Sequence, residues 1–183
     1  MRTLTTWSVA DYQHMRELGI LDRRRCELIQ GEIWDIAPEG EFHQFINDQG
    51  ADCLRRLLQD KARIFEAYPI TLTASEPQPD IDIVRLPNTH YLKHHPYPED
   101  IYWLIEVADT TLAYDLGAKR TLYAEAGIPE YWVINIADRT LTVFSDRQNN
   151  DFAKQDTVSS GIIHPVAFSE VAIGVQNLVS IPK

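Results

Sequence analysis

The sequence contains little cysteine and no long apolar run, and both absences count against whole classes of protein. Its two cysteines, Cys26 and Cys53, have neither CxxC spacing nor another metal-ligand pattern. A disulfide framework and a structural zinc site are therefore disfavoured, and two reduced thiols are expected. No apolar run approaches the roughly 20 residues needed to span a bilayer, and the first residues lack the apolar core of a signal peptide. We expect a cytoplasmic protein with no membrane-embedded segment.

Basic residues are also scarce. The sequence has 17 Lys and Arg against 27 Asp and Glu, which gives a formal net charge of −10. A broad nucleic-acid-binding surface needs a basic footprint, so this composition weighs against one. A local basic patch or a metal-bridged site stays open. The arginines at residues 23–25 and 55–56 form short clusters, although such clusters are usually solvated faces.

The rest of the composition suits one folded domain. The 183 residues are enough for a sizeable core, and hydrophobic residues make up 44% of them. Disorder is not expected at this hydrophobicity. We find no internal repeat and no linker, so we predict a single domain over residues 1–183.

Hydrophobic periodicity and turn residues predict an alternation of helices and strands. Helices are predicted over residues 6–19, 41–60 and 112–126, hairpins over 26–37 and 130–145, and strands over 63–73, 79–85 and 101–108. The Pro- and His-rich residues 86–100 are predicted to form a surface loop, and the polar residues 146–160 to be irregular. This order predicts an α/β or α+β fold with a mixed β-sheet flanked by helices.

Two acidic residues stand in strand-like segments. Asp80 follows Pro79 at the start of an apolar segment, and Glu106 interrupts the apolar run over 101–107. Such a run suits a strand covered on both faces, where a carboxylate is costly unless it is paired, hydrogen-bonded or bound to a cation. Each acid alone has an ordinary explanation, Asp80 as a turn residue and Glu106 in an ion pair. Together on neighbouring strands they indicate a site for a divalent cation.

The predicted helix after the second strand adds a lysine to this pair of acids. Lys119 lies four residues after Asp115, so the two share one helical face and can pair. Tyr123 lies one turn further on, which directs this face toward the protein. Two acids and a helical lysine suit a cation and an anionic substrate. His43, near the start of the second predicted helix, is in a position where histidine is more often a helix-end residue than a ligand.

Several motifs stand in a fixed order along the chain. They are Glu27-Leu28-Ile29-Gln30-Gly31-Glu32, His43, Pro79-Asp80, Ile105-Glu106-Val107-Ala108-Asp109, Tyr114-Asp115 with Lys119, and Tyr123-Ala124-Glu125-Ala126-Gly127-Ile128-Pro129-Glu130-Tyr131-Trp132. In this arrangement the chain resembles the Uma2 family (DUF820), a restriction-endonuclease-like group in the PD-(D/E)xK nuclease superfamily, over roughly residues 6–175. The most specific of these motifs is K-x-x-x-Y-x-x-x-G-x-x-E-Y-W, whereas Pro-Asp alone is weak.

The resemblance implies a restriction-endonuclease-like fold and a metal site. Asp80 and Glu106 would bind Mg²⁺ or Mn²⁺, and Lys119 would assist activation of the attacking water. Glu27 and His43 match family positions and would support the site.

The resemblance also implies a supporting role for Asp115, which would orient Lys119. One position departs from the superfamily pattern, because Ala108 stands two residues after Glu106, where a Lys is expected. The Uma2-type pattern implies that the lysine role has moved to Lys119 on the following helix.

The sequence therefore favours a metal-dependent endonuclease that hydrolyses DNA phosphodiester bonds. A non-catalytic interaction module on the same fold is a rival hypothesis, favoured by Ala108 and the acidic composition. A hydrolase of small phosphate esters is a second rival, and it would need a narrow closed pocket rather than an open groove lined by the arginine clusters. Cleavage of both DNA strands would suit a homodimer, which stays open.

Overall fold

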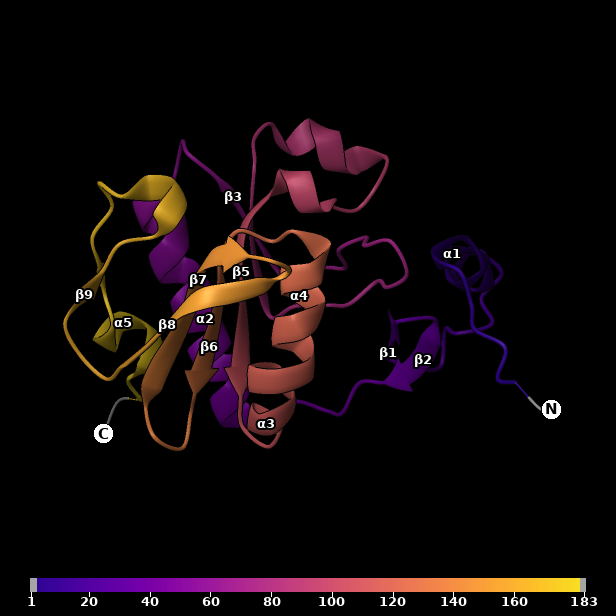
Figure 1. Ribbon diagram of the computed structural model, residues 1–183, viewed down its shortest axis with the longest axis horizontal. Helices are drawn as coiled ribbons and strands as arrows, with labels where there is room; N and C mark the ends of the chain where they lie inside the picture. The colour runs from indigo at the N-terminus through magenta and orange to yellow at the C-terminus, as the bar shows by residue number, and fades with distance from the viewer. Residues whose placement is uncertain (1–2, 182–183) are drawn as a thin grey trace.

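A six-stranded mixed β-sheet forms the centre of the computed structural model, which describes residues 3–181 (Figure 1). The strand order is β3-β4-β5-β6-β7-β8, with β5 and β6 parallel and the other neighbouring pairs antiparallel. The strands are β3 (Arg63–Glu66), β4 (Ile81–Val84), β5 (Ile101–Ala108), β6 (Tyr131–Asn135), β7 (Thr140–Gln148) and β8 (Asp151–Val158). The predicted fold class, a mixed sheet flanked by helices, is confirmed.

Helices cover both faces of this sheet, and each face has its own apolar core. Helix α2 (Glu41–Leu57) and the short helix α5 (Gln176–Val179) pack on one face. Helix α4 (Arg120–Ala126) lies on the other face (Figure 1). Successive residues of a strand point to opposite faces, so Trp103 of β5 is buried in the first core and its neighbour Leu104 in the second.

Shorter elements complete the fold. They are the 3₁₀ helices η1 (Asn88–Leu92), η2 (Pro98–Asp100) and η4 (Val166–Phe168), and the short strands β9 (Ile162–Ile163) and β10 (Ile173–Gly174). The first two lie in the segment predicted as a surface loop. No helix among residues 3–181 combines the length and the apolar character needed to cross a membrane.

The N-terminal segment lies beside the sheet (Figure 1). Helix α1 (Val9–Glu17) packs against a hairpin of β1 (Cys26–Ile29) and β2 (Glu32–Asp35), around the buried side chains of Tyr12 and Leu28. This hairpin is predicted from the sequence and is confirmed. Because side chains alternate along a strand, one face of the hairpin meets α1 and the other faces away from it.

Strand β1 also holds the chain segment that leads into β4. Backbone hydrogen bonds join Leu28 and Glu76 in both directions, and the N–H of Gly31 donates to the carbonyl of Ala74 at 2.9 Å. The hairpin is therefore fixed to the residues that precede β4.

The prediction of irregular structure over 146–160 is wrong. Strand β7 continues to Gln148, and β8 begins at Asp151. Asn149 and Asn150 form the turn between them, with φ of 49° and 63°, a conformation that Asn tolerates better than most residues. The residues of β8 are mostly exposed, so this edge strand lacks the apolar alternation from which strands are predicted.

Two further elements are shorter than predicted. The strand predicted over 63–73 ends at Glu66, because Ala67 has a φ of 45° that breaks the extended conformation. The helix predicted over 112–126 is divided into α3 (Leu112–Tyr114), a π-helical turn η3 (Asp115–Lys119) and α4. Apolar periodicity does not distinguish a single i→i+5 turn inside a helix from regular α-helix.

Gly31 is required by the tight β1–β2 turn, and its replacement tests how firmly the hairpin is held. Gly31 has a φ of +82°, and a Cβ there would lie 2.7 Å from the Cβ of Thr6. Gly161 has a φ of +96°, but a Cβ there would meet nothing within 4 Å. We expect Gly31→Ala to lower the free energy of unfolding by about 2 kcal/mol or more, and Gly161→Ala by about 1 kcal/mol. Urea unfolding measures both, and equal losses would contradict the role assigned to the contact with Thr6.

Candidate active site

The register of the sheet brings together the two acids predicted to form the site. Strands β4 and β5 pair antiparallel with Ile81 opposite Ile105. Because the strands are antiparallel, Asp80, which precedes Ile81, lies beside Glu106, which follows Ile105. The two side chains are therefore neighbours at this end of the strand pair. Glu106 is two residues from Leu104 and therefore points to the face that carries α4.

Protein donors hold one oxygen of Asp80. Its Oδ2 accepts the backbone N–H of Val107 at 2.7 Å and lies 3.2 Å from Nε2 of His43. Among residues 3–181, no hydrogen bond is made to Oδ1. The carboxylate is thus fixed in orientation while one of its oxygens stays open to a ligand.

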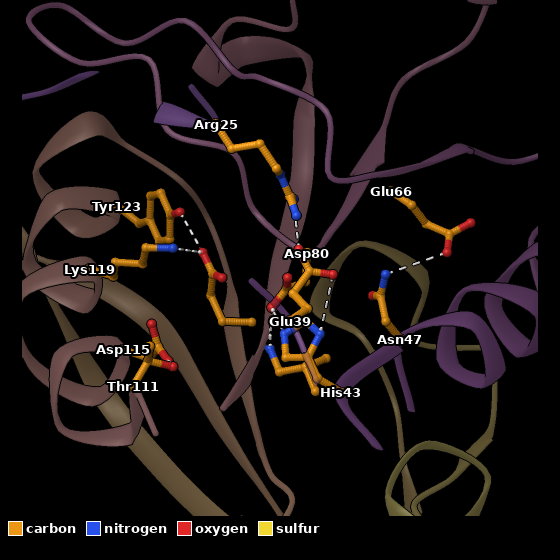
Figure 2. Close-up of polar contacts among 12 residues, drawn as sticks. Arg25, Glu39, His43, Asn47, Glu66, Asp80, Thr111, Asp115, Lys119 and Tyr123 are labelled. Carbon is orange, nitrogen blue, oxygen red and sulfur yellow. Dashed lines mark hydrogen bonds and ion pairs between the residues drawn. The ribbon is translucent and has the colours of Figure 1, made fainter. Parts of the chain in front are cut away.

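Glu106 is held in the same way from the helical side. Nζ of Lys119 at 2.9 Å and the hydroxyl of Tyr123 at 2.7 Å both donate to Oε1 of Glu106. Figure 2 shows the dashed lines from Lys119 and Tyr123 meeting at one oxygen. The described residues supply no donor to Oε2. Glu106 is only 3% exposed, and burial of a carboxylate is tolerated when it is paired and hydrogen-bonded.

Lys119 is a cation in this environment. Burial lowers its pKa, but the negative charges of Glu106, Glu27 and Asp115 raise it by more, so the pKa of Lys119 lies above its ordinary value. Burial raises the pKa of Glu106, and Lys119 opposes that rise. An ammonium group of this kind supplies positive charge and hydrogen bonds, and it does not accept a proton at neutral pH.

The π-helical turn η3 carries both Asp115 and Lys119. The direct pair between these two residues is not the contact observed: Lys119 donates to Glu106, and Oδ2 of Asp115 accepts the hydroxyl of Thr111 at 2.6 Å (Figure 2). Asp115 acts on Lys119 through its charge, which raises the pKa of the lysine. Turns of this type are often found at functional sites.

A chain of polar contacts links Asp80 to the residue before β1. Nδ1 of His43 lies 3.6 Å from Oε2 of Glu39, and Oε1 of Glu39 accepts a hydrogen bond from Arg25 at 2.7 Å (Figure 2). Burial lowers the pKa of His43, whereas the hydrogen bond to Asp80 and the charges of Asp80, Glu39 and Asp109 raise it by more. The imidazole therefore tends to keep its second proton beside Asp80.

Glu27 reaches the site from the hairpin. Its Oε2 accepts the backbone N–H of Gln78 at 3.2 Å, two residues before Asp80. Glu27 is 8% exposed, and its charge is one of those that raise the pKa of Lys119. It acts on the site at short range without a direct hydrogen bond to the lysine.

All six residues predicted for the site line one pocket of about 730 Å³. The β1–β2 hairpin forms one wall of it, and residues 109–122 form the other. Acidic side chains dominate the lining: Glu27, Glu32, Asp35, Glu39, Asp80, Glu106, Asp109 and Asp115, against the cations Arg25 and Lys119. Of the two arginine clusters, Arg25 alone reaches the lining, and Arg55 is paired with Asp52 and Glu66.

The carboxylate pair fits a hard divalent cation. Mg²⁺ and Mn²⁺ prefer oxygen ligands, and Mg²⁺ is commonly held by one or two carboxylates together with waters and substrate phosphates. Asp80 and Glu106 each present one oxygen that the described donors leave open, in a pocket with an excess of negative charge. Over residues 3–181 no group of three or more His, Cys, Asp or Glu side chains is arranged to hold a metal. The chain would therefore supply part of the coordination shell.

The sequence prediction assigns no role to two residues that lie close to the site. Tyr123 fixes Glu106, and its spacing of four residues from Lys119 on a helix is the signal that places both on one face. Asp82 is fully buried in β4, and the described residues provide no hydrogen-bond partner for either of its oxygens. Its spacing of two from Asp80 could have identified it, because both side chains then point to one face of the sheet.

Comparisons with known proteins identify the same family and fold. A family model described as Uma2, putative restriction endonuclease, matches residues 9–175. A crystal structure of a putative nuclease belonging to DUF820, from Anabaena variabilis, is similar with a TM-score of 0.65 and 16% sequence identity. That similarity covers 84% of this chain and 88% of the other and shows a shared fold. No curated protein matches the chain.

Asp82 provides a test of the electrostatics beneath the site. Burial raises the pKa of Asp82 well above its ordinary value, and the charges of Glu106 and Asp80 raise it further. Above about pH 4 the folded state then binds a proton that the unfolded state has released, so the free energy of unfolding falls as pH rises. We expect Asp82→Asn to reduce this fall between pH 5 and pH 8 by about 1 kcal/mol or more.

Urea unfolding in the presence of EDTA at both pH values measures this difference. Asp60 is exposed, so Asp60→Asn serves as a matched control. Its free energy of unfolding should change with pH as that of wild type does. An equal pH dependence in Asp82→Asn and wild type would show that Asp82 is not protonated in the folded protein.

Proposed function

The chain belongs to the Uma2 family, and from this premise we propose that it is a metal-dependent endonuclease that hydrolyses phosphodiester bonds of DNA. The family description supports a nuclease in general. The observation that carries the finer proposal is the arrangement of Asp80 and Glu106, each fixed through one oxygen and open at the other, with the cationic Lys119 on Glu106.

Asp80 and Glu106 would hold Mg²⁺ or Mn²⁺ through Asp80 Oδ1 and Glu106 Oε2. Bound there, the ion would polarise the phosphate and lower the pKa of a water molecule. The excess of acids in the pocket favours cation binding, and the same excess would repel a phosphate if no cation were present.

Lys119 would assist water activation by electrostatics rather than as a base. Its ammonium group is held at 2.9 Å from Glu106, so it can stabilise negative charge that develops next to the carboxylate pair. Glu27 and Asp115 keep this lysine charged. His43 holds Asp80 in place and carries a proton next to it, which makes it a candidate proton donor within the site.

A hydrolase of small phosphate esters is the second candidate, and the size of the pocket favours it. A volume of about 730 Å³ lies in the range of pockets that bind small molecules. Cleavage of plasmid DNA, measured beside hydrolysis of a nitrophenyl phosphodiester, separates the two candidates. Faster turnover of the small ester at equal concentration of scissile bonds would favour the second.

Metal binding tests the proposal directly. We expect Mn²⁺ to bind wild type in calorimetry, and Asp80→Ala and Glu106→Ala to weaken binding by more than about 100-fold, since even residues that only orient a ligand commonly cost 10- to 100-fold. Glu32→Gln removes an acid of the same pocket on the hairpin wall and should bind nearly as well as wild type. Circular dichroism checks that each variant is folded. Equal loss in Glu32→Gln would indicate a diffuse acidic field instead of a two-carboxylate site.

Lys119→Met separates catalysis from metal binding. The variant should bind Mn²⁺ at least as tightly as wild type, because it loses a positive charge next to Glu106. We expect kcat for DNA cleavage to fall about 10²- to 10³-fold, the usual cost of removing one group that stabilises developing charge. A variant that cleaves DNA at the wild-type rate would exclude Lys119 from the mechanism.

A further inference from the structure

The wall of the pocket formed by the hairpin carries an exposed tryptophan. Trp34 of β2 pairs with Glu27 of β1 across the hairpin, so their side chains share one face of it. The second pair on that face is Ile29 with Glu32, and all four side chains line the pocket. The opposite face packs on α1. Trp34 is 55% exposed, so the hairpin presents a large aromatic side chain to the space next to the carboxylate pair.

The opposite wall presents a second aromatic side chain. Tyr114 of α3 lines the same pocket and is 39% exposed. Nζ of Lys119 lies 6.0 Å from the centre of its ring, and the same Nζ donates to Glu106. Tyr114 is therefore a direct neighbour of the groups proposed to act on the phosphodiester.

Charge in the pocket is unsuited to binding a duplex through its phosphates. Eight acids line it, and its cations are already engaged: Arg25 with Glu39, Lys119 with Glu106 and the imidazole of His43 with Asp80. Duplex binding depends on Lys and Arg that neutralise successive phosphates. Aromatic side chains bind nucleic acid in another way, by stacking on an unpaired base, which a base inside a duplex does not offer.

We propose that Trp34 and Tyr114 form a base-stacking subsite for single-stranded DNA, which places an unpaired base between the two walls and its phosphate at Asp80 and Glu106. The subsite rests on the proposed nuclease function and specifies its substrate class: single strands or unpaired ends in preference to intact duplex. Stacking supplies the affinity that the acidic lining does not. The binding constant for single strands therefore has only a weak dependence on salt concentration.

Fluorescence anisotropy with labelled DNA of about 15 nucleotides tests this subsite, with Ca²⁺ in place of Mg²⁺ and the DNA checked on a gel for integrity. Wild type should bind the single strand at least about tenfold more tightly than the matching duplex. Trp34→Ala should weaken single-strand binding roughly 10- to 100-fold, the usual range for loss of one base–aromatic stack. Trp34→Phe should retain most of the affinity, and Tyr114→Leu should lose about tenfold.

Trp7 provides the matched control. It is 45% exposed and lies in the same N-terminal segment but does not line the pocket, so Trp7→Ala should bind the single strand as wild type does. Intrinsic fluorescence adds a second readout, because Trp103 and Trp132 are fully buried. Quenching by the single strand should be present in wild type and in Trp7→Ala and absent in Trp34→Phe.

The outcomes separate this inference from the proposed function. Single-strand binding that depends on Trp34, without metal binding or cleavage, would support the stacking subsite and remove the hydrolase. Metal-dependent cleavage with equal or tighter binding of duplex, or with full affinity in Trp34→Ala, would overturn the subsite and leave the hydrolase in place. Failure of wild type to bind either DNA would overturn the subsite as well.

Discussion

The buried ion pair between Lys119 and Glu106 is the interaction on which the arrangement of the site depends. Glu106 lies in a strand covered on both faces, and an uncompensated carboxylate there would destabilise the fold by several kcal/mol. Lys119 of the π-helical turn and Tyr123 of α4 compensate this carboxylate by donating hydrogen bonds to it. Both donors use the same oxygen, so the contact that stabilises the fold leaves the other oxygen without a donor among residues 3–181.

Asp80 is likewise held through one oxygen, by donors that come from different parts of the chain. The backbone of β5 and the ring of His43 on α2 fix one of its oxygens. The hairpin is linked to this group through Glu39 and Arg25. Sheet, helix and hairpin thus meet at two carboxylates, and the acids that line the pocket around them outnumber its cations. A bound cation would reduce the repulsion among these negative charges, so the charge of the site favours cation binding.

The sequence predicts much of this site because its signals are local. A carboxylate in the apolar run over 101–107 and a second after Pro79 identify Glu106 and Asp80, and strand pairing is enough to bring them together. The mixed sheet follows from the order of elements. The partner of Lys119 does not follow, because a helical spacing of four indicates Asp115 and gives no sign of the π-helical turn that directs the lysine to Glu106. Strand β8 is missed because an exposed edge strand has no apolar face to reveal it.

The proposed chemistry depends on whether Asp80 and Glu106 together hold a divalent cation. Diffraction from crystals grown with Mn²⁺, with the anomalous signal used to locate the ion, would show where the ion binds. We expect an anomalous peak within about 2.5 Å of both Asp80 Oδ1 and Glu106 Oε2, the range of direct oxygen coordination. Mn²⁺ bound elsewhere in the acidic pocket, or absent from it at saturating concentration, would contradict a metal site at Asp80 and Glu106 and favour a non-catalytic role for this fold.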